Sequence, residues 1–371
     1  MRKIILVVEN LNIGGVQRIA LDEAYQLSTQ GEPATIIVLN NPFNYEIESF
    51  THIEKQLIKK YNVEIIYIKG TKFDKIKGFR ALINQANLPI IFWSHSLTAT
   101  ALISFARFGL KKNVNLATTI HQIPALTDPK QRFKRYIYSL FSDVLFVFSK
   151  AAKMDWERRL KFIKCLPVLN KRQLIILRNG VFLPRLPEQA FELQLRTPKL
   201  RLVYLGRISK WKGLDLILEL ALTPQLIEAE ILLIIPSLSP SLHASIPVSV
   251  RNRITFQTGT AFNSYTPRSG DVHLYPTNYG SKALFWESIS INCLEMACVG
   301  IPSLVSQNGL ATWPEFKNSE LFLEVDWNNS IMVAETIINN FEKTFSKIKI
   351  DEIKKIVDVK NHVHVMLETF K

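Results

Sequence analysis

Short apolar runs that end in polar residues recur through most of this chain. The run at residues 3–9 is followed by a glycine turn, Gly14-Gly15, and then by residues 19–27, whose apolar positions repeat at helical spacing. Further runs that read as strands cover residues 35–39, 63–68, 89–93, 115–120, 143–148 and 174–177. This alternation predicts an α/β domain with a parallel sheet, in which the polar residues after the strands meet at one edge.

A second series of the same kind follows residues 182–197, a proline-containing stretch that we interpret as a linker. It begins with a strand at residues 200–205 and a helix at 214–221, and residues 331–371 predict amphipathic helices. Its remaining strands are expected at residues 230–235, 253–256, 271–275 and 303–306. A chain of 371 residues is long enough for two such domains, which we place at 1–182 and 183–371.

Composition limits the class of protein. A hydrophobic content of 47% is that of a packed globular chain. Three cysteines are too few and too scattered for a disulfide framework or a zinc site, so reduced thiols and a cytoplasmic location are expected. The first apolar run is too short for a signal peptide, and no stretch approaches the ~18 apolar residues of a spanning helix.

The net charge of +14 is unevenly placed. Residues 1–181 carry 27 Lys/Arg against 13 Asp/Glu, a difference of +14, and the remainder carries 19 against 19. Such an asymmetry is typical of a protein with an anionic partner, although a merely basic soluble surface is an equal alternative.

Two carboxylates stand eight residues apart in the second half. Glu287 precedes a short apolar run with helical spacing, and Glu295 lies within it. Ser290 or Asn292 is a candidate cap for the start of this helix, and Gly300 marks its end. The alternative to a ligand site is a pair of solvated helix carboxylates.

Cations and glycines follow the first strand of the second series. The loop runs Gly206-Arg207 to Lys212-Gly213 and opens the next helix. Backbone amides at a helix start, together with two full cations, form a good anion site. Two solvated loop cations are the alternative.

Three elements, the Gly14-Gly15 turn, the loop from Gly206-Arg207 to Lys212-Gly213 and the pair Glu287 and Glu295, resemble the donor-site motifs of GT-B glycosyltransferases in order and spacing. The resemblance is to family 4 (glycosyl transferases group 1) in particular. The resemblance covers most of the chain and is strongest over residues 178–307. It implies an α/β fold of the GT-B type, with two Rossmann-like domains facing a cleft. Residues 1–182 would be the acceptor domain and 183–371 the nucleotide-sugar donor domain, with the last helix crossing back onto the first domain.

The resemblance also implies roles for residues of the second half. Glu287, with the backbone of residues 288–290, would hold the donor sugar, and Glu295 the nucleotide ribose. Arg207 and Lys212 would bind the diphosphate. In the family the first Glu is commonly followed by Gly-Phe-Gly, whereas here Ser288, Ile289 and Ser290 follow it.

In the first half, the resemblance implies that the Gly14-Gly15 loop faces the donor diphosphate. Two histidines, His95 and His121, follow predicted strands. His121 follows its strand as the family's first-domain histidine does, so we favour it over His95 as a group that hydrogen-bonds the transferred sugar. The Asp that usually comes next in the family is Gln122 here.

The expected activity is therefore that of a retaining glycosyltransferase of hexosyltransferase type, with His121, Arg207, Lys212 and Glu287 as catalytic residues. It would use a nucleoside diphosphate sugar, UDP-sugar favoured, and a glycan or lipid-linked glycan acceptor, in cell-surface polysaccharide or glycoconjugate synthesis. No Asp-x-Asp pair occurs in the chain, so no metal or other cofactor is expected.

The partners expected are the nucleotide sugar, the acceptor and an anionic membrane surface, with the protein peripheral at the inner membrane face. Alternatives are a sugar-nucleotide epimerase of the same architecture, an inactive sugar-binding homologue, or a nucleic-acid-binding protein. The last lacks a recognisable nucleic-acid-binding motif, so no nucleic-acid partner is expected.

Overall fold

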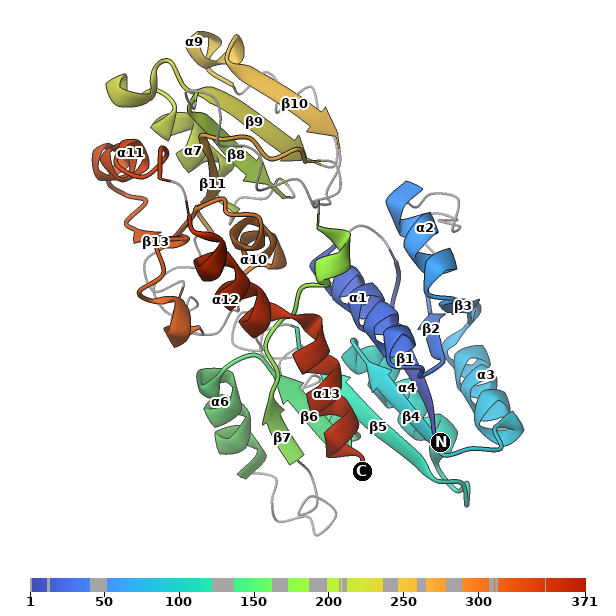
Figure 1. Cartoon of the computed structure of the whole chain (residues 1–371). Helices are drawn as coiled ribbons and strands as arrows, with labels where there is room; N and C mark the ends of the chain where they lie inside the picture. Colours follow the sequence, from blue (N-terminus) through green and yellow to red (C-terminus); the bar gives the residue numbers. More distant parts are fainter. Residues whose placement is uncertain are drawn as a thin grey trace. The chain divides into compact units, whose positions relative to one another are not determined.

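The computed structural model (Figure 1) divides into two compact units, Met1–Phe182 with Val359–Lys371, and Leu183–Asp358. It describes residues 2–11, 14–40, 52–121, 137–161, 173–186, 199–206, 208, 212–235, 246–258, 265–277, 289–306, 310, 313–343 and 345–371. Among these residues, no helix has the length and apolar character needed to cross a bilayer.

The first unit is built on a seven-stranded sheet in the order β3-β2-β1-β4-β5-β6-β7, with every pair parallel. Its strands are β1 (Lys3–Val8), β2 (Ala34–Val38), β3 (Glu64–Tyr67), β4 (Ile90–Ser94), β5 (Val114–Thr119), β6 (Val144–Val147) and β7 (Gln173–Ile176). Most are apolar on both faces, as parallel strands covered by helices require.

Helices cover both faces of this sheet. Helices α1 (Gly15–Thr29), α2 (His52–Lys60) and α13 (Val359–Thr369) share a core with alternate residues of β1, such as Leu6 and Val8. On the opposite face, Ile5 and Val7 pack with α3 (Lys72–Gln85) and α4 (Leu97–Arg107). Helix α6 (Lys150–Lys161) precedes β7.

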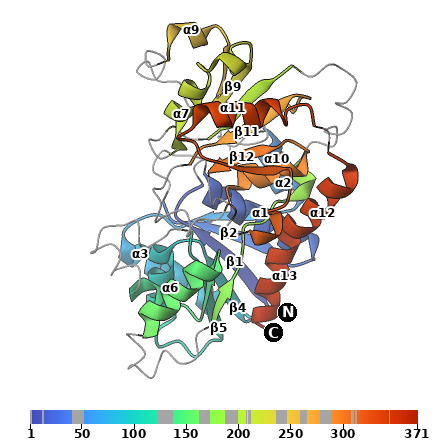
Figure 2. The ribbon, with the colours of Figure 1, turned by 90° about the vertical axis from the view of Figure 1, so that its left-hand side faces the viewer.

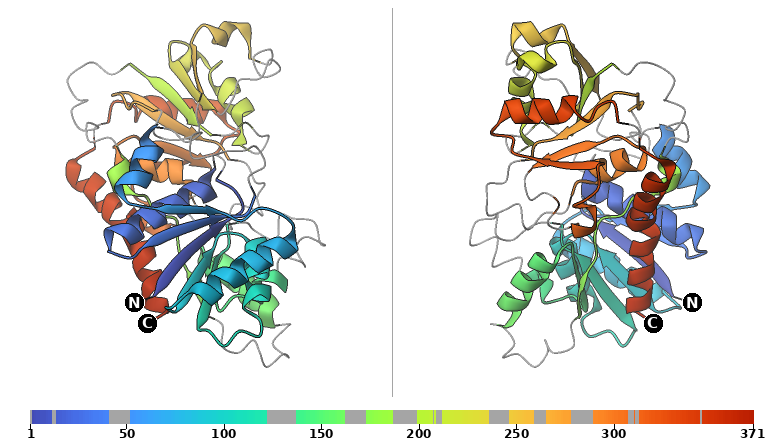
Figure 3. Two further views of the ribbon diagram at one scale, coloured as in Figure 1. Left: turned by 90° about the vertical axis from the view of Figure 1, so that its right-hand side faces the viewer. Right: turned by 60° about the vertical axis from the view of Figure 1, so that its left-hand side comes forward.

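The last helix closes the first unit. The Val359 amide donates to the Val181 carbonyl over 3.0 Å, and the Arg2 guanidinium donates to the carbonyls of Leu367 and Phe370, each at 3.0 Å. The two chain ends accordingly lie side by side (Figures 2 and 3). Phe182, which sequence reasoning assigned to the linker, is 1% exposed in this core, so that assignment was wrong at its first residue.

The second unit holds a six-stranded sheet in the order β10-β9-β8-β11-β12-β13, again parallel throughout. Its strands are β8 (Arg201–Leu205), β9 (Glu230–Ile235), β10 (Ile254–Thr258), β11 (Asp271–Tyr275), β12 (Ser303–Ser306) and β13 (Phe322–Val325). A buried two-pronged ion pair joins the two central strands, with Arg201 Nε and Nη2 each 2.7 Å from Asp271 oxygens.

Two pairs of helices pack within this unit. Helices α7 (Leu214–Leu220) and α11 (Ser330–Ile338) share a core with Leu202, Tyr204 and the alternate residues of β9. Residues of α10 (Ile291–Cys298) pack with Val203 and Leu205 on the other face, and α10 contacts α12 (Lys347–Val357). A short helix, α9 (Val248–Arg251), precedes β10.

Each strand expected from sequence is present, with ends shifted by at most two residues. The second sheet has one strand more than expected, β13. This strand was not predicted because it is only four residues long and half of its residues are not buried. Helices α2, α3, α4 and α6 were not predicted. A cap signal was present for α3, where Thr71 and Asp74 form a reciprocal capping box.

Substituting Gly180 tests how the last helix is docked. A Cβ at this position would stand 2.6 Å from the Val359 Cα atom, so the backbone at the start of α13 has to move. We expect Gly180→Ala to lower the free energy of unfolding by about 1–3 kcal/mol, the usual cost of overpacking. Gly15→Ala is the control, since nothing lies within 4 Å of its added Cβ. Equal stability of the two variants in urea titrations would contradict this docking.

Candidate functional site

Both sheets present their candidate residues at the carboxyl ends of the central strands. In each sheet the order of connection reverses between two neighbours, β1 and β4 in the first unit and β8 and β11 in the second. Ligands of open parallel sheets bind outside the strand ends at such a reversal. The predicted site residues in the described part of the chain lie on the loops and helices that follow these strands or their neighbours.

In the second unit, Lys212 lies just after β8 and reaches the end of β11. Its ammonium donates to the Tyr275 hydroxyl over 2.8 Å and lies 4.7 Å from the centroid of the tyrosine ring. Gly213 follows with φ +64°, and a Cβ there would stand 2.5 Å from the Pro276 carbonyl oxygen. A glycine is therefore required for this loop to approach β11, and the approach fixes the backbone that carries the lysine cation.

Helix α10 starts at the same edge and carries the second glutamate. Ser290 caps its start by accepting from the Asn292 amide, and Asn292 Nδ2 donates to the Leu205 carbonyl over 3.1 Å. Glu295 is fully buried within this helix, and Ile289 is buried just before it. Gly300, at φ +79°, follows its end as the sequence predicted.

Three residues predicted for the donor site, Arg207, Glu287 and Ser288, lie outside the described residues, as does Gln122. Their roles stay predictions from sequence. The lysine and Glu295 nevertheless emerge from elements adjacent to one strand reversal, β8–β11, because α10 follows β11 in the chain and is tied to the end of β8.

In the first unit, the glycine turn leads straight into α1. Gly14 is the residue before the helix, in extended backbone with φ −173°, and its carbonyl accepts from the Arg18 amide over 3.1 Å. The space at Gly15 is open, as the absence of any atom within 4 Å of an added Cβ indicates. Such a bare backbone at the start of a 15-residue helix is accessible to an anionic group.

The two histidines that sequence analysis separated are in direct contact. His95 follows β4 and His121 follows β5, and His95 Nδ1 lies 2.9 Å from His121 Nε2. Their rings stack with centroids 5.2 Å apart, and Phe148 borders His121 at 5.6 Å. Burial lowers the pKa of His95 to about 3, and burial and the neighbouring His95 hold the pKa of His121 well below its usual range. Both rings are therefore neutral near pH 7.

Sequence reasoning missed the residues behind this pair. Glu23, on α1, is fully buried, with Oε2 2.9 Å from His95 Nε2 and Oε1 3.2 Å from His362 Nδ1 on α13. A signal was available, since Ile19, Glu23 and Leu27 recur every four residues and so share a helix face. A carboxylate at a core position of an amphipathic helix indicates a polar partner inside the protein.

Metal or thiol chemistry has little support among the described side chains. No three His, Cys, Asp or Glu residues among them come together as a metal site, and metal independence stays a prediction. Cys293 and Cys298 are buried, and burial raises the pKa of both thiols, which keeps them protonated and unreactive.

No protein-family model matches the sequence, and a search of curated proteins finds no match. Solved structures are similar over the whole chain. Sucrose-phosphate synthase (tll1590) from Thermosynechococcus elongatus matches with TM-score 0.66 and 15% identity, covering 100% of this chain and 98% of that one. Anabaena Alr3699/HepE in complex with UDP-glucose matches with TM-score 0.70 and 11% identity, covering 99% of each chain.

A glycosyltransferase from Rickettsia africae also matches, with TM-score 0.69, 14% identity, and coverage of 100% of this chain and 98% of that one. At such identities the likeness is one of fold. The chain has the α/β fold of these proteins, with two Rossmann-like units, and the GT-B fold expected from sequence is confirmed.

The buried histidines predict a loss of stability in mild acid. Burial lowers the pKa of His273 to about 3, as it does for His95, and His121 is shifted in the same direction. A depressed histidine pKa means that the unfolded state takes up protons first, so stability falls as pH drops below about 6.5. His95 and His273 then each contribute a loss of about 2 kcal/mol between pH 7 and pH 5, and His121 acts in the same direction.

Glu23 acts in the opposite sense, because burial raises its pKa to about 7. The raised pKa contributes its full stabilisation below the carboxyl pKa of the unfolded chain, and this contribution is lost as pH rises to about 7. Between pH 7 and pH 5 it offsets roughly the loss of stability caused by one histidine. We therefore expect urea titrations to show a net loss of at least about 2 kcal/mol between pH 7 and pH 5. His273→Gln should reduce this loss, whereas His364→Gln, at a side chain 68% exposed, should not. A pH-independent unfolding free energy would contradict the burial of neutral histidines.

Proposed function

We propose that the protein is a glycosyltransferase, of hexosyltransferase type, that moves a sugar from a UDP-sugar to a hydroxyl group of a glycan or lipid-linked glycan. The observation that carries this proposal is the position of Lys212, fixed by Tyr275 and Gly213 at the strand reversal of the second sheet. The fold adds support, since Anabaena HepE has been crystallised with UDP-glucose. Retention of the anomeric configuration, family 4 membership and a place in cell-surface polysaccharide or glycoconjugate synthesis belong to the same proposal.

The second unit takes the donor in this proposal. Lys212, with Arg207 five residues before it in sequence, offsets the negative charge that grows on the diphosphate as the sugar bond breaks. Glu295 is assigned to the ribose hydroxyls in this proposal, and its carboxylate, fully buried here, has to become accessible when the donor binds. Glu287, with the chain at residues 288–290, would bind the sugar. Two cations held by protein could perform the task that a metal performs elsewhere, so no cofactor is needed.

The first unit is the acceptor domain in this proposal, and its Gly14-Gly15 loop and His121 are assigned, as they were from sequence, to the donor diphosphate and the transferred sugar. The open backbone at Gly14-Gly15 is suited to a phosphate group, and His121 is suited to a sugar hydroxyl because its neutral ring carries one donor and one acceptor nitrogen.

Kinetics of three donor-site variants test this division of work. Lys212→Ala should lower kcat for UDP-sugar hydrolysis or transfer by about 10²–10³, the scale of losing one preorganised charged partner. Glu295→Gln should mainly raise the donor KM, since ribose contacts do not change during the reaction. Glu287→Gln should fall between these two.

Lys199→Ala is the matched control, because Lys199 also belongs to the second unit but pairs with Glu230 at the other end of the sheet. It should leave both constants unchanged. A near-normal kcat for Lys212→Ala would remove the basis of the diphosphate assignment.

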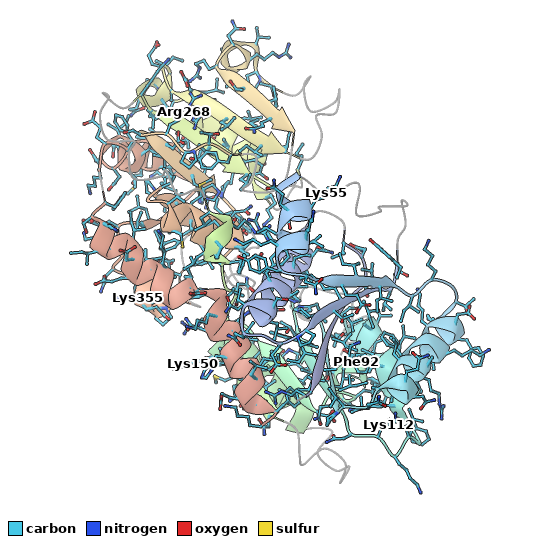
Figure 4. The ribbon with its side chains drawn as sticks, turned by 45° about the vertical axis from the view of Figure 1, so that its right-hand side comes forward. Lys55, Phe92, Lys112, Lys150, Arg268 and Lys355 are labelled. Carbon is cyan, nitrogen blue, oxygen red and sulfur yellow. The ribbon has the colours of Figure 1, made fainter. Side chains whose placement is uncertain are left out.

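We also propose that the protein associates peripherally with anionic membrane at the inner face of the membrane, where a lipid-linked acceptor would lie. Basic residues of the first unit such as Lys55, Lys112 and Lys150 are exposed to solvent, whereas Phe92 of β4 is buried in the core (Figure 4). Helix α3 combines both properties a lipid surface requires. It exposes several cations and also Phe73, which is 64% exposed with Lys77 Nζ 4.7 Å from its ring centroid.

Neutralising the cations of α3 tests this membrane contact. Lys72, Lys77 and Arg80 are all exposed, and each cation near an anionic leaflet contributes roughly 1 kcal/mol. The triple Gln variant should therefore lose most of its co-sedimentation with vesicles containing phosphatidylserine, and added salt should weaken binding of the wild type.

The control triple replaces exposed lysines of the second unit, Lys317, Lys343 and Lys347, with Gln. It should bind as the wild type does. Equal binding to neutral vesicles, or none to either kind, would exclude an electrostatic contact.

A further inference from the structure

The end of strand β11 carries a tyrosine in direct contact with the lysine assigned to the diphosphate. Lys212 Nζ donates to the Tyr275 hydroxyl over 2.8 Å and lies 4.7 Å from the centroid of the tyrosine ring. Tyr275 is the last residue of β11, one of the two strands at the connection reversal of the second sheet. Both residues are partly exposed, so a ligand bound at this edge can reach them.

The ring of Tyr275 is held by two paired strands. His273 lies two residues earlier on β11 and therefore on the same face, and its ring stacks on the tyrosine ring with centroids 6.3 Å apart. His273 Nδ1 in turn lies 2.9 Å from the Ser303 hydroxyl oxygen on the neighbouring strand β12. Burial, together with the charge of Lys212, lowers the pKa of His273 to about 3. A neutral, fully buried ring thus supports Tyr275 and adds no charge of its own.

The contact with Lys212 determines which hydrogen bonds the Tyr275 hydroxyl makes. A lysine ammonium has only protons to donate, so the hydroxyl oxygen is the acceptor in this contact. The O–H group of the tyrosine must then donate to a different acceptor. Hydrogen bonds in a chain polarise one another, so an oxygen that accepts from a cation becomes a stronger donor through its own proton. The acceptor that matches such a donor best is an anionic oxygen.

We propose that Tyr275 is a diphosphate-binding residue, whose hydroxyl donates to an oxygen of the phosphate group that the Lys212 ammonium binds. The 2.8 Å separation of ammonium and hydroxyl places both within reach of one phosphate group. Tyr275 supplies a directed hydrogen bond and no charge, so it orients a phosphate that the cation attracts. The identity of the ligand as a nucleoside diphosphate rests on the proposed function.

Calorimetric binding of UDP tests this contact without sugar transfer. UDP is the leaving group with its charge fully developed, so its affinity reports contacts to the diphosphate directly. Tyr275→Phe removes one oxygen atom and keeps the ring that stacks on His273. It should weaken UDP binding by about 10–100-fold, the scale of losing a hydrogen bond to a charged group. Uridine affinity, measured by competition, should not change, whereas a distorted site would weaken both ligands.

A double-mutant cycle tests whether Tyr275 and Lys212 act on the same phosphate. In the Lys212→Ala background the hydroxyl has lost the cation that polarises it, and the phosphate is no longer held beside it. Tyr275→Phe should therefore weaken UDP binding much less in this background than in the wild type. Equal losses in the two backgrounds would overturn the pairing.

Tyr265→Phe is the matched control, because the Tyr265 hydroxyl donates to Asp271, at the opposite end of the same strand. It should lower stability and leave the UDP affinity of the folded protein unchanged. Unaltered UDP affinity in Tyr275→Phe, in a protein that transfers sugar, would refute this inference alone. Weakened UDP binding in Tyr275→Phe with no transfer by the wild type would refute the proposed function and keep the inference. Failure of the wild type to bind either UDP or inorganic pyrophosphate would overturn the inference.

Discussion

Parallel pairing of every strand is the constraint on which both units depend. Strands that all run in one direction bring their carboxyl ends to a single edge, and the connection order reverses once in each sheet. At each reversal the loops after two neighbouring strands can approach one another. The cation of Lys212 meets Tyr275 in this way, and His95 meets His121 across two adjacent strands. The chemistry of each unit is thus determined first by strand direction.

The two edges hold charge in different ways. At the second sheet, the ammonium of Lys212 donates to the Tyr275 hydroxyl and lies 4.7 Å from the centroid of its ring. At the first sheet, the carboxylate of Glu23 is buried behind the histidines, with Oε2 2.9 Å from His95 Nε2, and His95 Nδ1 lies 2.9 Å from His121 Nε2.

The fold was largely predictable from sequence, because parallel strands buried on both faces leave continuous apolar runs such as residues 230–235, which match β9 without change. Strand β13 was not predicted because it is short and half of its residues are not buried. The glycine turn, Lys212 and the cap at Ser290 were found from local patterns. The contact between Glu23 and His95 could not be found from local patterns, because the two residues are 72 positions apart in the sequence and meet only through tertiary packing.

The most direct test of the account is a screen for nucleoside diphosphate release from UDP-, GDP- and ADP-sugars, with and without a glycan acceptor, in the presence of a chelator. The account predicts release of UDP from a UDP-sugar, stimulated by acceptor and insensitive to the chelator. Recovery of an epimerised nucleotide sugar, or failure of every donor both to bind and to react, would contradict it.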